Sequence, residues 1–245
     1  TAMAAEFANQ LKDPTFNELG FEERLGLLVN AEWNRRQSNK LNRFIRNARF
    51  AVPSATVEGI EYYEDRKLDK AQILRFATGQ YIDEGHHIIR KGASGNGKTY
   101  IACALGNAAC RRFKKVQYIR MPELLDELSI ARSGGTLKKV LESYKKKDLL
   151  ILDEWLIRPL SPQESYDMLE IVEARCHKST IFCTQYESEG WYTRIDPNPE
   201  SDSPVSEAIM DRIVHNAYEV LADGRVSMRE RTVLRAAREG GGKDV

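Results

Sequence analysis

The sequence predicts an α/β protein, in which a parallel β-sheet is flanked by helices and preceded by a small helical domain. From residue 86 onward, apolar segments of strand length alternate with segments of helical periodicity. Such alternation favours a parallel sheet with right-handed crossovers. A glycine-rich loop follows the first of these strands, and a helical segment rich in small residues follows that loop. Residues 21–52, in contrast, contain only helical patterns.

The single elements follow from apolar periodicity and turn residues. Strands are predicted at 86–91, 116–120, 148–154, 179–185 and 217–222. Helices are predicted at 68–83, 100–112, 122–132, 137–147, 163–175 and 206–215, with a loop over 187–205. Because Pro53 disfavours a helical residue before it, we place a domain boundary there. The predicted domains are 1–52 (helical), 53–235 (nucleotide-binding) and 236–245 (a flexible tail).

Composition excludes few functions. The chain has 245 residues, 42% apolar content and a formal net charge of +1, so total charge does not indicate nucleic acid. No apolar run approaches the ~20 residues that a membrane span needs. Four cysteines show no C-x-x-C spacing, and we interpret them as reduced core thiols of a cytoplasmic protein.

The glycine-rich loop matches the phosphate-binding pattern G-x-x-x-x-G-K-[ST], and it stands between a strand and a helix as that pattern requires. Backbone N–H groups of such a loop cradle phosphate oxygens, while Lys98 reaches the outer phosphates and Thr99 binds Mg²⁺. A purely structural glycine turn is the alternative. The residues predicted to bind the nucleotide are Gly92, Ala93, Ser94, Gly95, Asn96, Gly97, Lys98, Thr99 and Tyr100.

Polar side chains also end two other predicted strands. Asp153 and Glu154 follow a continuous apolar run, so we expect them beside Lys98 at the carboxyl edge of the sheet. Asp153 would hold Mg²⁺, and Glu154 would deprotonate the attacking water. Thr184 or Gln185 would contact the γ-phosphate or that water. The alternative in each case is a solvated polar group at a strand end.

Residues 31–50 form a basic amphipathic helix on a helical wheel. Its cations fall within about half the circumference, and apolar side chains occupy the other side. We expect this face to contact the phosphate backbone of nucleic acid. A solvated face is one alternative, and a membrane-surface helix is a weaker one. The cations are Arg35, Arg36, Lys40, Arg43, Arg46 and Arg49.

Taken together, these segments resemble the IstB/DnaC group of AAA+ ATPases. The resemblance covers nearly the whole chain and is closer to IstB, the transposition helper of bacterial insertion sequences, than to the helicase loaders DnaC and DnaI. The segments that carry it are GASGNGKT at 92–99, LLILDEW at 149–155, TIFCTQ at 180–185, EAIMDRIVHNA at 207–217 and DGRVSMR at 223–229.

The resemblance implies an ATP- and Mg²⁺-dependent protein that oligomerises on double-stranded DNA and engages an IstA-like transposase. It makes Lys98 and Thr99 the Walker A pair, and Asp153 and Glu154 the Walker B pair. Gln185, with Thr184 as the second candidate, takes the sensor position. Three arginines have implied roles: Arg212 as a finger acting on a neighbour's ATP, Arg175 as a competing finger, and Arg229 as a terminal sensor.

The sequence departs from the family pattern at Ala93, Tyr100 and Trp155, and the last of these would change contacts with DNA or a partner. A DnaC/DnaI-type replicative helicase loader shares the ATPase and is the alternative function. A small-molecule kinase and an inactive scaffold are further alternatives. The intact set of Walker residues argues against the scaffold.

Overall fold

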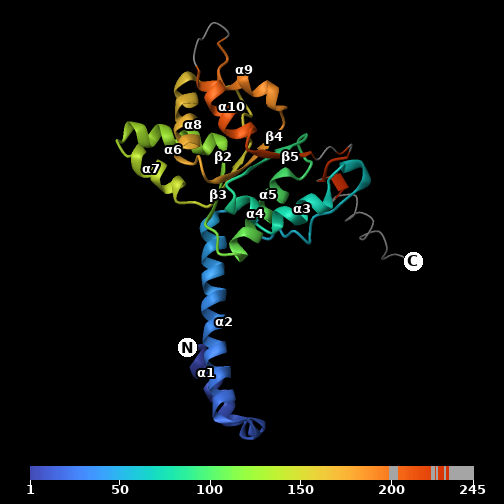
Figure 1. Ribbon diagram of the computed structural model, residues 1–245, viewed down its shortest axis with the longest axis vertical. Helices are drawn as coiled ribbons and strands as arrows, with labels where there is room; N and C mark the ends of the chain where they lie inside the picture. The colour runs from blue at the N-terminus through green and yellow to red at the C-terminus, as the bar shows by residue number, and fades with distance from the viewer. Residues whose placement is uncertain (199–203, 222–223, 225, 229, 232–245) are drawn as a thin grey trace, which may run out of the picture. The chain divides into compact units, whose positions relative to one another are not determined.

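The computed structural model describes residues 1–198, 204–221, 224, 226–228 and 230–231 (Figure 1). Its contacts divide the chain into two compact units, Thr1–Phe44 and a second unit that begins at Ile45. This division precedes the boundary predicted from Pro53, because the segment between them packs with the second unit. Ala48 is fully buried there and Phe50 is 6% exposed. The predicted tail at 236–245 lies outside the described residues.

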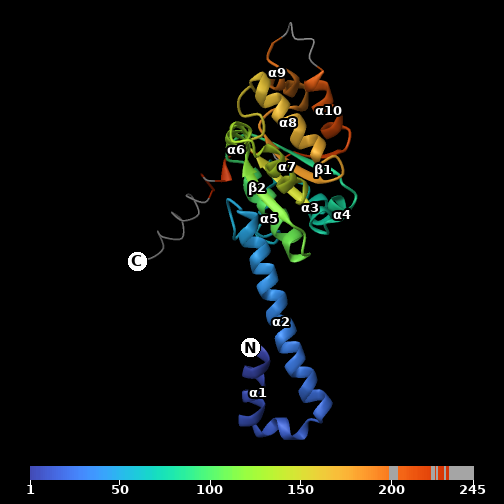
Figure 2. The same cartoon turned by 90° about the vertical axis from the view of Figure 1, so that its left-hand side faces the viewer.

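The first unit is an antiparallel helical hairpin. It consists of α1 (Ala2–Lys12), the short 3₁₀ helix η1 (Pro14–Glu18) and most of α2 (Phe21–Ala48). The helices α1 and α2 lie side by side (Figure 2). Hydrogen bonds from Ala2 N to Glu32 and from Gln10 to the Arg24 carbonyl, both 3.1 Å long, join them. Acidic residues in the first turn of α2 favour that helix end. The helix stops where Arg49 adopts a left-handed backbone with φ of 56°.

The second unit is built on a five-stranded sheet in which all neighbouring strands are parallel (Figure 1). Its order is β2-β3-β4-β1-β5. The five predicted strands and the parallel sheet are therefore confirmed. The strands are β1 (His87–Lys91), β2 (Val116–Arg120), β3 (Leu149–Asp153), β4 (Ser179–Thr184) and β5 (Ala217–Leu221).

Helices cover both faces of this sheet. The helices α3 and α5 pack together on one face, while α6, α7, α8 and α10 lie on the other (Figures 1 and 2). A capping box between Ser161 and Glu164 starts α8. The helices are η2 (Glu64–Arg66), α3 (Lys70–Ala77), α4 (Gln80–Asp83), α5 (Lys98–Arg111), α6 (Met121–Ser133), α7 (Leu137–Lys145), α8 (Pro162–Ala174), η3 (Ser188–Trp191), α9 (Tyr192–Ile195) and α10 (Val205–Val214).

Two local predictions were wrong. The single helix predicted at 68–83 is interrupted between α3 and α4, because Gly79 adopts a left-handed backbone with φ of 77°. The segment predicted as a loop at 187–205 contains η3 and α9, which pack through fully buried Trp191 and Ile195. Long apolar side chains there signalled burial, but proline and acidic residues concealed the short helices.

A close approach fixes α5 against the sheet. A Cβ atom on Gly106 would lie 2.5 Å from the Phe50 ring and 2.9 Å from Ile151, so only glycine fits between them. The core on the other face contains Trp155, 1% exposed, in edge-on contact with Phe182 and Trp191. The expectation that Trp155 contacts DNA or a partner is therefore wrong, because its side chain belongs to the core.

Three of the four cysteines are buried as predicted. Burial raises the pKa of Cys103 to about 11 and that of Cys110 to about 12, and it also raises the pKa of Cys183. Cys176 is exposed, because it follows the end of α8 rather than lying within a core element. Among the described helices, none combines the length and apolar character needed to cross a membrane.

Candidate functional site

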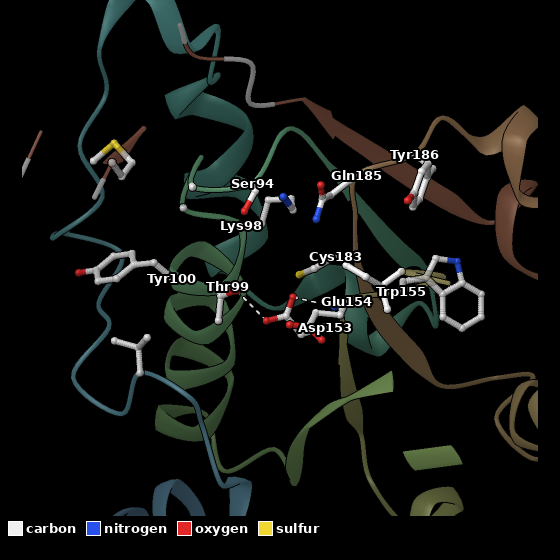
Figure 3. A pocket seen from close by; sticks show the side chains of 15 residues that line it. Ser94, Lys98, Thr99, Tyr100, Asp153, Glu154, Trp155, Cys183, Gln185 and Tyr186 are labelled. Carbon is white, nitrogen blue, oxygen red and sulfur yellow. Dashed lines mark hydrogen bonds between the residues drawn. The ribbon is translucent and has the colours of Figure 1, made fainter. Parts of the chain in front are cut away.

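The candidate site is a cavity of about 420 Å³ at the carboxyl edge of the sheet (Figure 3). Its walls come from the β1–α5 loop, the ends of β3 and β4, and a short C-terminal segment. Parallel strands present their carboxyl ends at one edge, which is where ligands bind in open α/β sheets. Lining residues that the sequence analysis did not assign to the site are Val52, Trp155, Ile157, Cys183, Tyr186 and Met228.

The glycine-rich loop forms a tight turn into α5, which begins at Lys98. Gly95 and Gly97 adopt left-handed backbones with φ of 84° and 72°. The Lys98 ammonium folds back and donates to the carbonyls of Gly92 (2.7 Å) and Ala93 (2.8 Å). Burial lowers the pKa of Lys98. A lysine in this position is available to an anionic ligand that displaces the two carbonyl contacts.

The predicted nucleotide-binding residues divide into two groups. Gly92, Ala93 and Asn96 shape the loop without lining the cavity. Tyr100 lines the cavity, and its hydroxyl accepts a 3.5 Å hydrogen bond from the backbone N–H of Thr56. The other predicted residues that line the cavity are Ser94, Gly95, Gly97, Lys98 and Thr99.

Asp153, the last residue of β3, contacts the first turn of α5. One carboxylate oxygen accepts from the Thr99 hydroxyl at 2.6 Å (Figure 3). The same oxygen also accepts from the Tyr118 hydroxyl at 2.9 Å. The adjacent hydroxyl and carboxylate are hard oxygen ligands of the kind that Mg²⁺ prefers. No cluster of three or more His, Cys, Asp or Glu side chains suited to a metal occurs in the described parts of the chain. Magnesium held here would therefore take its remaining ligands from phosphates and water.

Glu154 is held by an arginine that the sequence analysis did not identify. Arg120, the last residue of β2, donates to the Glu154 carboxylate at 2.7 Å. The strand register places Arg120 beside Asp153, so the parallel pairing of β2 with β3 explains the contact. Both side chains remain partly exposed, at 47% and 33%. Arg120 is a charged residue at the end of the predicted strand 116–120, but its contact with Glu154 could be predicted only by knowing that this strand pairs with the strand at 148–154.

The two sensor candidates occupy different environments. Thr184 is 1% exposed, and its hydroxyl donates to the Trp155 carbonyl (3.1 Å) and accepts from Tyr186 N (3.2 Å). Gln185 instead lines the cavity, and Figure 3 shows its side chain extending toward Lys98. Because β4 lies between β1 and β3, Gln185 stands between the glycine-rich loop and the acidic pair.

Arg212 lies near the end of α10, which leads into the amino end of β5. It is therefore at the opposite edge of the sheet from the cavity of its own chain. Its guanidinium donates to Glu173 at 3.0 Å and to the Ala208 carbonyl at 2.9 Å. Arg212 thus forms an ion pair with Glu173 of α8. The terminal candidate, Arg229, lies outside the described residues.

Arg175 does not fit a finger. It is 2% exposed, and its guanidinium donates to the carbonyls of Tyr144 (2.6 Å), Lys147 (3.0 Å) and Ser179 (2.6 Å). A buried guanidinium with three carbonyl partners cannot reach a neighbouring subunit without opening the core. Sequence position alone, just before a strand, did not distinguish this role from an exposed one.

The C-terminal segment closes one side of the cavity. Met228 lines the cavity, and its backbone N–H donates to the Gly95 carbonyl at 2.9 Å. A Cβ atom on Gly95 would lie 2.8 Å from Ser227 Cβ, so this contact also requires glycine. The segment at 227–228 therefore touches the phosphate-binding loop directly.

The predicted DNA-contacting cations lie in two surroundings. In the first unit, Arg35, Arg36, Lys40 and Arg43 are exposed. Glu32 accepts from Arg35 at 2.7 Å and from Arg36 at 3.0 Å, and these hydrogen bonds lower its pKa to about 2. Part of the positive charge of this helix is therefore neutralised within the unit.

In the second unit, Arg46 and Arg49 line a cavity of about 630 Å³ together with Lys147. Arg49 follows the end of α2 in a left-handed conformation, so its predicted place on the helical wheel is wrong. Burial and the charge of Arg49 lower the pKa of Lys147. The structure gives these three cations no ion pair within its described residues.

Comparisons with known proteins agree with this geometry. The family model of the IstB-like ATP binding protein matches residues 1–236. A putative insertion sequence ATP-binding protein of Sinorhizobium fredii is 36% identical over 228 residues, covering 91% of this chain and 89% of that protein. The IS1162 putative ATP-binding protein of Pseudomonas fluorescens is 36% identical over 187 residues, covering 76% and 81%.

Among solved structures, the DnaC helicase loader superposes with a TM-score of 0.59 at 19% identity, covering 69% of this chain and 96% of that chain. At this identity the likeness concerns the fold, that of an AAA+ P-loop ATPase. The match over residues 1–236 and the two relatives establish more: this chain belongs to the family of IstB-like ATP-binding proteins.

Proposed function

We propose that this protein is an ATPase that assembles on double-stranded DNA and presents target DNA to a partner transposase. The observation that carries the proposal is the convergence of Lys98, Thr99, Asp153, Glu154 and Gln185 on one cavity. The names of the two relatives refer to insertion sequences, which supports the transposition context.

In the proposed hydrolysis, Lys98 leaves the two loop carbonyls and binds the outer phosphates of ATP. Thr99 and Asp153 would hold Mg²⁺, and the ion would neutralise charge on the phosphates. Glu154 orients and deprotonates the attacking water, and Gln185 contacts the γ-phosphate. Thr184 is the poorer sensor candidate, because its hydroxyl already binds two backbone groups.

Shared active sites would couple hydrolysis to assembly. Arg212 lies at the opposite sheet edge from its own cavity, so it can stabilise phosphoryl charge only at a neighbour's cavity. Its exposed pair with Glu173 is weak enough to exchange for a phosphate. This arrangement makes an isolated subunit a poor ATPase.

The cations without an ion pair support DNA binding. Arg43 has no ion pair within the described residues, and neither do Arg46, Arg49 and Lys147. Side chains of this kind contact phosphates without reading sequence, so binding should be largely sequence-independent and strongly salt-dependent. A helicase-loader function is the second candidate, and the fold of DnaC is compatible with it.

Sizing the protein with ATP, with DNA, with both and with neither tests the assembly proposal. We expect the largest species with both ligands. Glu154→Gln should bind ATP and accumulate in that species, because hydrolysis no longer releases it. Wild-type turnover in this variant would remove Glu154 from the role of base. Co-purification with a replicative helicase, and no response to a transposase, would favour the loader.

Reversing Arg43, Arg46 and Arg49 to Glu tests the DNA surface. Losing three phosphate contacts should lower the slope of log affinity against log salt by about 2–3 for all DNA sequences. The matched control reverses three exposed cations elsewhere, Lys67, Lys70 and Arg111. An equal loss in the control, or an unchanged slope in the first variant, would place the DNA contact elsewhere.

A further inference from the structure

A buried arginine that does not line the nucleotide cavity holds the phosphate-binding loop from behind. Arg66 is the last residue of the short helix η2 and is 3% exposed. Its guanidinium donates to the backbone carbonyl of Asn96 at 2.9 Å, in a buried hydrogen bond, and to the carbonyl of Glu61. Asn96 belongs to the glycine-rich loop that leads into α5. Arg66 therefore ties this loop to a segment that is distant in the sequence.

The hydrogen bond from Arg66 fixes the direction of one peptide unit of the loop. In a planar trans peptide, the carbonyl of one residue and the N–H of the next point in opposite directions. A guanidinium that binds the Asn96 carbonyl therefore turns the Gly97 N–H away from itself. Gly97 lines the nucleotide cavity, and none of the hydrogen bonds among the described residues uses its N–H. This N–H is thus an open donor at the cavity.

Close packing holds the Arg66 side chain in place. A Cβ atom on Gly97 would lie 3.2 Å from Arg66 Nη2, and a Cβ atom on Gly224 would lie 3.4 Å from Arg66 Cγ. Gly97 also has a left-handed backbone with φ of 72°, which favours glycine. The guanidinium and its stem are therefore confined between two glycine backbones, and the loop carbonyl meets a donor whose position is fixed.

The burial of this cation is not explained by the fold alone. Nε of Arg66 is buried without a hydrogen-bond partner, and Arg66 forms no ion pair with any residue that the structure describes. Burial and the charge of Arg231 lower the pKa of Arg66. An incompletely paired buried charge destabilises a protein. An apolar side chain of similar length would fill the same space without that cost.

The C-terminal segment holds the adjacent carbonyl of the same loop. The Met228 N–H donates to the carbonyl of Gly95 at 2.9 Å. Arg231 forms an ion pair with Asp65, the residue before Arg66, at 2.5 Å. Two successive loop carbonyls are therefore held by two different segments, and an ion pair joins those segments to each other. The loop is restrained from outside the cavity before any ligand binds.

Arg90 is a second buried cation near this loop, and its contacts differ from those of Arg66. It is 1% exposed in β1, just before the loop, and donates to the carbonyls of Val220 (2.9 Å) and Lys91 (3.4 Å). Its charge lowers the pKa of Lys98, which shows that it acts on the same site. Arg90 therefore has the charge and the burial of Arg66 but makes no hydrogen bond to the loop.

We propose that Arg66 is a positioning residue for nucleotide binding, because it holds the Asn96 carbonyl and thereby aims the Gly97 N–H at the phosphates of the nucleotide. Arg66 does not touch the nucleotide and acts through the loop. The proposal rests on the ATP binding of the proposed function, and it is independent of DNA, assembly and a transposase. Without Arg66, the loop keeps Lys98 and Thr99 but loses the fixed direction of one donor.

The first test measures the affinity of the full-length protein for ATP and for inorganic tripolyphosphate, a probe without a base. Arg66→Met removes both hydrogen bonds and keeps the length of the side chain. Loss of an oriented N–H donor to a charged oxygen should weaken both ligands by the same ~10–100-fold. Arg90→Met is the matched control. It removes an equal charge but no bond to the loop, and should weaken both ligands by less than ~5-fold.

Thermal unfolding without ligand verifies that each variant is folded. If Arg66→Met does not fold, Arg66→Gln takes its place, because its amide remains a polar donor but is too short to keep both carbonyls. Equal losses of affinity in the Arg66 and Arg90 variants would overturn the proposal, since charge alone would then explain them. Wild-type affinity in the Arg66 variant would overturn it as well. A wild-type protein that does not bind ATP would overturn the proposed function too, so the two failures are distinguishable.

The second test observes the Gly97 amide directly, by NMR of protein labelled with ¹⁵N-glycine. Saturating tripolyphosphate should displace the Gly97 resonance of the wild type, because its N–H then donates to a phosphate oxygen. At equal saturation the displacement should fall by at least ~50% in Arg66→Met, since a hydrogen bond weakens steeply with misalignment. Arg90→Met should match the wild type. A merely structural role of Arg66 would lower stability and leave the saturated resonance unchanged, and that result would refute the proposal.

Discussion

The two edges of the sheet in the second unit hold similar polar residues in opposite states. At the carboxyl edge, Lys98 and Glu154 are partly exposed to a cavity and make contacts that a ligand can displace. At the amino edge, Arg175 and His87 are buried, at 2% and 5% exposure, and their polar atoms bind the backbone. Ionisable side chains are therefore open to a ligand at one edge and support the fold at the other.

This difference follows from topology. Strand–helix loops at the carboxyl edge leave the ends of adjacent strands open to a ligand. At the amino edge, helices such as α8 and α10 return to the sheet, and their last carbonyls need donors. Arg175 supplies such donors to Tyr144 and Lys147 at the end of α7. Substitutions at the two edges should accordingly separate ligand binding from folding.

Lys98→Ala should give the largest effect. Removing the ammonium should weaken ATP binding by more than ~100-fold, because no other lysine approaches the phosphate loop within the cavity lining. Its free energy of unfolding should change by less than ~1 kcal/mol, since burial already disfavours the charged form. Lys91→Ala, at the end of β1, is the control and should bind ATP normally. Unaltered nucleotide affinity in Lys98→Ala would contradict the assignment.

Arg175→Met should give the reverse result. It leaves three carbonyls, two of them in buried hydrogen bonds, without their donor and should lower the free energy of unfolding by about 3 kcal/mol. ATP affinity of the folded fraction should stay unchanged. Denaturant unfolding and nucleotide titration measure the two quantities on one sample. A stable variant with impaired hydrolysis would instead restore Arg175 as a finger.

The sequence predicted the carboxyl edge well and the amino edge poorly. The loop at 92–99 and the acidic pair at 153–154 have fixed spacing, and each adjoins a recognisable strand, so their meeting follows from parallel topology alone. The contacts of Arg120 and Arg175 depend on which strands are neighbours and which carbonyls lack donors. Neither the strand order nor the carbonyls that lack donors can be predicted from local sequence periodicity.

Lowering the pH should destabilise the folded protein through His87, which is buried at the amino edge of the sheet. Burial, reinforced by the charge of Arg175, lowers the pKa of His87 to about 4 from an ordinary 6.5. Between these values the unfolded chain binds a proton that the folded chain does not, so stability is complete above pH 6.5 and falls as the pH drops. The free energy of unfolding should decrease by about 2 kcal/mol between pH 7 and pH 5.

His87→Gln is the comparison for this prediction, because it removes the titrating group and keeps a polar side chain of similar size. The variant should lose most of the pH dependence over this interval. Equal slopes in the two proteins would assign the dependence to other groups.

Arg120→Gln should give the smallest effect. It tests whether the ion pair with Arg120 restrains Glu154 at the carboxyl edge. The pair with Glu154 is 2.7 Å long but partly exposed, and such pairs contribute only about 0.2–1 kcal/mol. While this ion pair is formed, the Glu154 carboxylate contacts the Arg120 guanidinium rather than a water molecule. Releasing it should therefore raise ATP turnover by up to ~5-fold without changing ATP affinity. Arg158→Gln, which breaks a similarly exposed pair with Glu164 outside the cavity, is the matched control. A large fall in turnover on Arg120→Gln would show instead that Arg120 stabilises the reacting phosphate. ATP hydrolysis would then require the charges of both Arg120 and Glu154.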